Sequence, residues 1–166
     1  MKTSYLNGKE NAINYCDILF TLYPLTAEET GRKGVHLKYK SQSKHPLHDY
    51  GKGPFCEFDA PDEIRDKKGL YIFVVDGRVK YIGRCRDSFE KRISKGYGHI
   101  SPRNCYKGGQ PTNCHINNKL NEAFEQGSKV YLGVYEMTDI EKICSLEKEI
   151  LKKLDKNNPD NWNIQH

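Results

Sequence analysis

The sequence predicts an α+β domain in which helices flank a small, mainly antiparallel, three-stranded sheet. The first observation is an apolar run, an Asp-Gly pair and a second short run between residues 69 and 83, an order typical of a tight β-hairpin. The second is the order of the predicted elements, which is strand, strand, helix, helix, strand, helix. The third is the composition, since 36% of the 166 residues are hydrophobic and 30% are charged, as in an ordinary globular protein.

The first 68 residues are predicted to form a basic extension that precedes the main domain of residues 69–166. Residues 1–14 are polar and are expected to be loose, and residues 15–25 form a short helix or a strand, which periodicity does not decide. Residues 35–40 alternate apolar with basic side chains, which predicts a half-buried strand. Its basic residues are His36, Lys38 and Lys40. They could follow phosphates, and a merely solubilising surface is an equal alternative.

The elements after the hairpin are predicted from caps and apolar spacing. A helix begins at Asp87 or Ser88 and ends at two glycines, Gly96 and Gly98. The pattern continues with a loop, a helix, a strand and a helix, over residues 100–113, 115–126, 130–135 and 139–154. These elements complete the predicted α+β order.

Positive charge is concentrated in one segment of the chain. The chain has a net charge of +5, whereas nine Lys and Arg against three Asp and Glu give residues 76–107 a net charge of +6. Such clustering fits a polyanionic partner. The sequence has no apolar run that could span a membrane and no secretion signature, so we expect a cytoplasmic protein with reduced thiols.

Two triplets enclose the hairpin: it opens with Gly69-Leu70-Tyr71, and its second run is followed by Tyr81-Ile82-Gly83. This pair resembles the motif of the GIY-YIG nuclease family, with Leu70 in place of the usual Ile, and the resemblance covers residues 69–163. It implies a compact, divalent-metal-dependent endonuclease that hydrolyses DNA phosphodiester bonds, such as a restriction-type or mobile-element enzyme.

The resemblance also implies a role for each residue that matches the family's motif. Tyr71 helps to activate the attacking water, and Tyr81 lies near the same water or the scissile phosphate. Arg92 binds that phosphate. Glu147 is the single carboxylate on the metal ion, so water and phosphate oxygens complete the ligand shell, which suits Mg²⁺ (or Mn²⁺). The amide of Asn163 braces the site.

The chain departs from the family pattern at Gly96, where many members carry His four residues after the Arg. Tyr97 and His99 are the neighbouring alternatives for proton transfer, and His99 is included among the predicted catalytic residues. Duplex DNA is expected to be held by the basic extension and by cationic side chains around the site. These are Lys38, Lys40, Arg84, Lys91, Lys95, Arg103 and Lys107.

The hairpin sets a geometric condition for this site. A strict two-residue turn at Asp76-Gly77 would pair Tyr71 with Ile82 and place the rings of Tyr71 and Tyr81 on opposite faces. A shared site needs both rings on one face. We therefore expect one extra residue in the turn, as in a three-residue loop with a bulge.

Other interpretations stay open. A single Tyr in an apolar strand is usually a core residue, and a single Glu in a helix is usually on the surface. Cys105, Cys114 and His115, with His99, are an alternative zinc site, although their spacing lacks a close Cys pair and reduced, partly buried thiols are the default. The alternative function is a non-catalytic nucleic-acid-binding module on the same scaffold. The sequence leaves the recognition sequence and the oligomeric state open, a dimer included.

Overall fold

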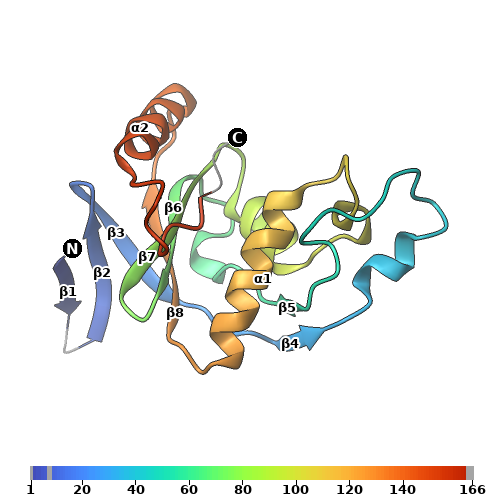
Figure 1. Cartoon of the computed structure of the whole chain (residues 1–166). Coiled ribbons are helices and arrows are strands. Elements are labelled where there is room, and N and C mark those ends of the chain that lie inside the picture. The colour runs from blue at the N-terminus through green and yellow to red at the C-terminus, as the bar shows by residue number, and fades with distance from the viewer. Residues whose placement is uncertain (1, 7–8, 164–166) are drawn as a thin grey trace. The chain divides into compact units, whose positions relative to one another are not determined.

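The computed structural model describes residues 2–6 and 9–163, which divide into two compact units. Unit 1 combines Met1–Leu25, Pro61–Phe89 and Lys129–His166, and unit 2 combines Thr26–Ala60 and Glu90–Ser128. Both units therefore draw on the first 68 residues and on the rest of the chain. Figure 1 shows the elements of both units. No helix in the described part of the chain is long and apolar enough to cross a membrane.

Unit 1 is built on a six-stranded sheet with the strand order β1-β2-β3-β8-β6-β7. All neighbouring strands are antiparallel. The strands are β1 (Lys2–Leu6), β2 (Lys9–Tyr15), β3 (Ile18–Pro24), β6 (Gly69–Val75), β7 (Arg78–Cys85) and β8 (Val130–Glu136). The α+β class and the antiparallel pairing agree with the prediction, whereas the sheet is larger than the predicted three strands.

The additional strands come from the N-terminal segment, drawn in blue in Figure 1. The expectation that residues 1–14 are loose was wrong for those that the structure describes, and Met1, Asn7 and Gly8 lie outside the described residues. A tight turn with positive φ at Cys16 and Asp17 joins β2 to β3. β3 then pairs with β8, and its buried and exposed residues alternate. Pairing with the distant strand β8 decides that β3 is extended, and the local composition of residues 15–25 does not show this pairing.

One face of this sheet packs against the helix α2 (Ile140–Lys153). Leu70, Ile72 and Ile82 on the sheet share a core cluster with Ile143 and Ile150 of the helix. Asp139 caps the helix, since its Oδ1 accepts a hydrogen bond from the backbone N–H of Lys142 at 3.2 Å. The predicted third strand and last helix therefore form where their periodicity placed them. A short 3₁₀ helix, η2 (Asp62–Ile64), precedes β6.

Unit 2 contains the long helix α1 and several short elements. These are β4 (Glu29–Arg32), 3₁₀ helix η1 (Val35–Tyr39), β5 (Phe55–Glu57), π-helix η3 (Glu90–Gly98), 3₁₀ helix η4 (Pro102–Cys105) and α1 (Pro111–Glu125). Asn117 of α1 is fully buried and binds β5, because its Oδ1 accepts from the N–H of Cys56 at 2.8 Å and its Nδ2 donates to the Cys56 carbonyl at 2.9 Å. This side chain extends the hydrogen bonding of β5 in place of a neighbouring strand.

Two predicted elements of unit 2 differ from the structure. Residues 35–39 form the 3₁₀ helix η1 and not a strand, because Gly34 at φ 75° turns the chain and its carbonyl accepts from the N–H of Leu37. Lys38 and Lys40 are nevertheless exposed, as the strand prediction required, and His36 is half-buried. Helix α1 begins at Pro111, inside the expected loop, because Pro suits the first helical position.

The β6–β7 hairpin meets the predicted geometric condition by another route. Its turn has only two residues, Asp76 and Gly77, both with positive φ, so the expected longer turn was wrong. The extra residue is Lys80 within β7, because Phe73 pairs with Tyr81 and Val74 with Val79. This bulge places the rings of Tyr71 and Tyr81 on one face, with centroids 6.2 Å apart. The prediction of a shared face is confirmed.

The glycines at the outer ends of the two triplets meet spatial requirements. Gly69 has φ 146°, and a Cβ there would collide with the carbonyl oxygen of Tyr135 in β8. At Gly83, a Cβ would collide with the Tyr71 hydroxyl and ring, which lie across this glycine. The second glycine therefore provides the space that the first tyrosine occupies.

We expect Gly83→Ala to lower the free energy of unfolding by about 1–3 kcal/mol, because the added methyl group displaces the buried Tyr71 ring. Urea denaturation of the variant and the wild type measures the difference. Gly96→Ala is the matched control, since a Cβ there would be 3.4 Å from the Lys91 carbonyl oxygen, an ordinary contact, and Ala favours a helix. Equal stability of Gly83→Ala and the wild type would contradict the packing of Tyr71 over Gly83.

Candidate active site

Three predicted site residues of unit 1 meet at three consecutive residues of β7, Ile82 to Arg84. The Tyr71 ring and hydroxyl lie over Gly83. The Asn163 side chain is hydrogen-bonded to the backbone of Ile82, and the Glu147 carboxylate is paired with Arg84. The end of the second triplet therefore collects groups from β6, from α2 and from the C-terminal segment. Each of these groups is positioned by a different part of the chain.

The two tyrosines belong to an aromatic cluster on the face of the sheet opposite α2. Tyr71 is fully buried and Tyr81 is 8% exposed. The Tyr71 ring has Phe73 and Phe89 as edge-on neighbours, with centroids 6.0 and 6.3 Å away. Phe89 is held there because its N–H donates to the Lys67 carbonyl at 2.9 Å. The rings thus contribute to the core, and a chemical role falls to their hydroxyl groups.

Glu147 lies on α2, on the other face of the sheet. Its Oε2 is 3.0 Å from a guanidinium nitrogen of Arg84, and its side chain is only 13% exposed. Arg84 pairs with Leu70 across the strands, so its side chain points to the α2 face. Arg84 was predicted to bind DNA, and in this structure it neutralises the carboxylate. The predicted surface position of Glu147 also needs correction, because most of the side chain is covered.

Asn163 closes the outer edge of β7. Its Oδ1 accepts from the N–H of Ile82 at 3.1 Å, and its Nδ2 donates to the Ile82 carbonyl at 2.8 Å. One step earlier, the N–H of Trp162 donates to the carbonyl of Lys80, the bulged residue, at 2.7 Å. Asn163 therefore satisfies backbone groups that an edge strand otherwise leaves unpaired. Its role in bracing an active site stays a prediction.

Ionic contacts fix the same C-terminal segment to the strand. The Lys80 ammonium donates to Asp160 Oδ1, and the Arg78 guanidinium lies 3.2 Å from Oδ2 of the same carboxylate. The hydrogen bond from Lys80 holds the pKa of Asp160 below its usual value. Asp160 therefore stays ionised, and the segment that carries Asn163 is attached at the bulge.

Glu147 is the one predicted metal ligand, and its chemistry fits the proposed ion. Mg²⁺ prefers oxygen ligands and is commonly bound by one or two carboxylates together with water and phosphate oxygens. The Glu147 carboxylate is mostly buried, and pairing with Arg84 offsets the cost of burying its charge. Among residues 2–6 and 9–163, no group of three or more His, Cys, Asp or Glu could hold a metal ion without added ligands.

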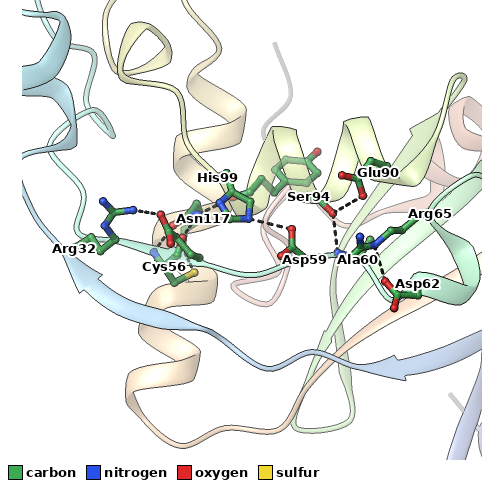
Figure 2. Close-up of polar contacts among 12 residues, drawn as sticks. Arg32, Cys56, Asp59, Ala60, Asp62, Arg65, Glu90, Ser94, His99 and Asn117 are labelled. Atoms are coloured by element: carbon green, nitrogen blue, oxygen red, sulfur yellow. Dashed lines mark hydrogen bonds and ion pairs between the residues drawn. The ribbon is translucent and has the colours of Figure 1, made fainter.

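The other predicted catalytic residues, Arg92 and His99, lie in unit 2. Arg92 is on η3, where a guanidinium nitrogen donates to the Tyr97 hydroxyl at 2.7 Å and the guanidinium carbon lies 4.7 Å from the ring centroid of Tyr97. His99 follows the last residue of η3, and its Nε2 lies 3.0 Å from Asp59 Oδ1 (Figure 2). Asp59 was missed by the sequence analysis, because no motif links it to a histidine forty residues later.

The cysteines of the predicted alternative zinc site lie in an apolar cluster of unit 2. Cys105 and Cys114 are free thiols, fully buried with Val35, Phe55 and Tyr106. A hydrogen bond with Cys105, together with burial, raises the pKa of Cys114. Cys56, elsewhere in this unit, has a pKa raised to about 12 by burial. The same hydrogen bond lowers the pKa of Cys105. Burial of all three thiols gives them the character of core residues, and His115 stacks on Tyr50 with ring centroids 4.6 Å apart.

Six of the seven predicted DNA-binding residues belong to unit 2, and all six are exposed. They are Lys38, Lys40, Lys91, Lys95, Arg103 and Lys107. Unit 2 carries twelve Lys and Arg against eight Asp and Glu, a net charge of +4, which is most of the net charge of the chain. The cationic surface that a polyanion would meet is therefore carried mainly by unit 2.

We expect Asn163→Ala to speed hydrogen exchange at the Ile82 amide and to lower the free energy of unfolding by about 1–3 kcal/mol, since two hydrogen bonds are lost. NMR measures the hydrogen-exchange rate of the Ile82 amide, and urea denaturation measures the free energy of unfolding. The control is Asn157→Ala, at an exposed position of the same segment, which should leave both quantities unchanged. Equal exchange rates at Ile82 in the two variants would show that Asn163 does not protect the strand edge.

Comparison of the chain with family models, with curated proteins and with solved structures gave no match.

Proposed function

We propose that the protein is a cytoplasmic endonuclease that hydrolyses phosphodiester bonds of duplex DNA with a divalent metal ion, Mg²⁺ or Mn²⁺. The observation that supports this proposal is that Tyr71, Glu147 and Asn163 all contact Ile82 to Arg84 of β7, with Tyr71 and Glu147 on opposite faces of the sheet. These residues are far apart in the chain, and the GIY-YIG motif requires all of them in one site. A restriction-type or mobile-element enzyme is the class of nuclease that we propose.

The edge position of β7 gives these groups a common point of approach. β7 is the outermost strand of the sheet, with the tyrosines on one face and the Arg84–Glu147 pair on the other. We assign the phosphate to the edge beside Gly83, next to the residue that Asn163 covers. There the Tyr71 hydroxyl would orient the attacking water, and Glu147 would hold the metal ion. When bound, the ion neutralises charge on the phosphate and on the leaving oxygen.

Arg92 and the exposed lysines would supply the remaining charge. A guanidinium matches two phosphate oxygens, and the Tyr97 contact fixes the Arg92 side chain in one position before substrate arrives. The exposed lysines of unit 2 would bind the backbone without reading sequence. The proposal therefore assigns metal binding to unit 1 and contacts with DNA phosphates to the cationic side chains of unit 2.

Another reading is supported by one specific contact. Arg84 already neutralises Glu147, and Tyr71 is fully buried. Glu147 and Tyr71 could therefore stabilise the fold without taking part in catalysis. A nucleic-acid-binding module without catalysis would have these same contacts. The distinction lies in whether the Glu147 charge is needed for cleavage.

We expect Glu147→Gln to reduce DNA cleavage by roughly a thousandfold or more, because the charge that would hold the ion is lost. The variant should fold, since Gln can accept a hydrogen bond from Arg84, and DNA affinity should hold or rise slightly. Cleavage of supercoiled plasmid and of genomic DNA, which offers many short sequences, is measured with Mg²⁺ and with EDTA. A gel-shift titration gives the affinity.

The matched control is Glu149→Gln, which changes an exposed carboxylate on the same helix and should cleave at the wild-type rate. Loss of cleavage in the control alone would mean that the ligand was wrongly chosen. Wild-type cleavage by both variants would remove the metal-site assignment. If the wild type binds DNA but cuts neither substrate with Mg²⁺ or Mn²⁺, the binding-module alternative holds.

We expect duplex DNA binding to weaken steeply with salt. Several phosphate contacts release counterions, so affinity should fall by about three orders of magnitude between 50 and 200 mM salt if six contacts form. Replacing both Lys38 and Lys40 by Gln should reduce the slope of log affinity against log salt by roughly two. Fluorescence anisotropy over a salt series measures this. A slope unchanged by the double substitution would remove η1 and Lys40 from the DNA-binding surface.

A further inference from the structure

The positive charge of unit 2 is concentrated in one part of it, residues 33–54 and 100–110, which we call the basic lobe. The lobe has seven Lys and Arg against one acid, Asp49, a net charge of +6. The rest of unit 2 has five Lys and Arg against seven Asp and Glu, a net charge of −2. Besides four of the predicted DNA-binding residues, the lobe contains Lys33, Lys44 and Lys52. Such a concentration of one sign of charge attracts a polyanion.

The cations of the basic lobe have no counter-charge within the chain. All seven are exposed, and none of them forms an ion pair or a side-chain hydrogen bond with residues 2–6 or 9–163. Other cations of unit 2 are paired: Arg32 forms an ion pair with Glu57, and the Lys119 ammonium lies 3.8 Å from a carboxylate oxygen of Glu122. The charge of the lobe is therefore available to an anionic partner.

The two segments of the basic lobe are packed against each other. Val35 and Tyr106 belong to one apolar cluster, and the N–H of His48 donates to the Cys105 carbonyl at 3.2 Å. A Cβ at Gly51 would collide with the same carbonyl oxygen, so the absence of a side chain there allows the close contact. The cations are thus carried on backbone whose position is set before a partner arrives, which lowers the entropic cost of binding.

Leu37 of η1 is an apolar side chain on this cationic surface. It is 57% exposed, the largest fraction among the exposed large hydrophobic residues that the structure describes. A 3₁₀ helix has three residues per turn, so Gly34, Leu37 and Lys40 share one face of η1. A Cβ at Gly34 would lie 3.5 Å from a methyl carbon of Leu37, which confirms this arrangement. The face therefore presents one apolar side chain next to a cation.

The backbone beneath Leu37 is fixed to the body of the lobe. Val35 is buried in the apolar cluster, and Tyr39 packs against the same cluster. The His36 carbonyl accepts a hydrogen bond from the Tyr106 hydroxyl at 2.8 Å. These contacts hold η1 from both sides of Leu37. Its side chain thus has the rigid support that a side chain inserted into a partner needs.

We propose that the basic lobe docks on the minor groove of duplex DNA and that Leu37 inserts there between two neighbouring base pairs. The inference rests on duplex DNA as the partner in the proposed function, and it requires neither cleavage nor a metal ion. The minor groove is about 6 Å wide, so it admits single side chains. Proteins that bind it combine cations at the phosphates with an apolar wedge, such as Leu, that partly unstacks one base step and bends the duplex.

Docking is tested by fluorescence anisotropy with a short duplex in EDTA, which prevents cleavage. Each of Lys33→Gln, Lys44→Gln and Lys52→Gln should lower the slope of log affinity against log salt by about one. Lys119→Gln changes a paired cation of unit 2 outside the lobe and should leave the slope unchanged. Asp49→Asn should raise the affinity, because it removes the one acid of the lobe. The wild-type slope in all three lysine variants would overturn the docking surface.

Insertion is tested by resonance energy transfer between dyes at the two ends of the duplex, again in EDTA. The wild type should bend the DNA and bring the ends closer. Leu37→Ala should remove most of the bend and lower the affinity by about tenfold, with the salt slope unchanged because no phosphate contact is lost. Leu37→Met keeps a wedge and should keep the bend. Leu19→Ala, which truncates a similarly exposed leucine of unit 1, is the control. Equal bending by the wild type and Leu37→Ala overturns insertion.

The outcomes are separable from those of the proposed function. Duplex DNA that is bent through Leu37 but not cut with Mg²⁺ or Mn²⁺ overturns the nuclease and supports the inference. Cleavage by a wild type that leaves the bound duplex straight overturns the inference alone. Tighter binding of single-stranded DNA or of RNA than of duplex DNA also overturns the inference, because the minor groove is then not the docking site. No binding of any nucleic acid overturns both.

Discussion

The extra residue Lys80 in β7 sets the register on which the candidate active site depends. Without it, Tyr71 would face Ile82, and the two tyrosines would lie on opposite faces of the hairpin. With it, Tyr71 lies across Gly83, and Arg84 turns to the face that carries α2. One inserted residue thus decides which groups reach each face. The Lys80 carbonyl accepts a hydrogen bond from the N–H of Trp162, so the bulged residue also helps to attach the C-terminal segment.

That attachment solves a problem of the sheet and serves the site at the same time. The outer edge of β7 would otherwise present unpaired backbone groups. A side chain amide, from Asn163, pairs with Ile82 where another strand would normally do so. The Asn163 amide is short, so it pairs with only one residue of the β7 edge. The ion pairs of Asp160 with Arg78 and Lys80 hold the C-terminal segment beside the bulge. The candidate site therefore lies where the sheet stops.

Local pattern was enough to predict the hairpin, β8 and α2, because apolar periodicity, an Asp-Gly turn and an Asp cap act within a few residues. It was not enough for β1 to β3, whose pairing partners are distant and whose composition is polar. The motif located Tyr71, Glu147 and Asn163, but the partners Arg84 and Asp59 follow from three-dimensional contact. The alternating pattern of residues 35–40 gave a wrong prediction of a strand, because Gly34 starts the 3₁₀ helix η1 there.

Arg84 and Asp59 have the same kind of relation to a proposed catalytic side chain. Each contacts one atom of its partner, Oε2 of Glu147 or Nε2 of His99, and so restrains that side chain. Arg84 places a positive charge beside the mostly buried Glu147 carboxylate and so offsets the cost of burying it. Asp59 places a carboxylate oxygen 3.0 Å from Nε2 of a partly exposed imidazole. Each pair lies within one unit, Arg84 with Glu147 in unit 1 and Asp59 with His99 in unit 2, so each contact is formed by its own unit alone.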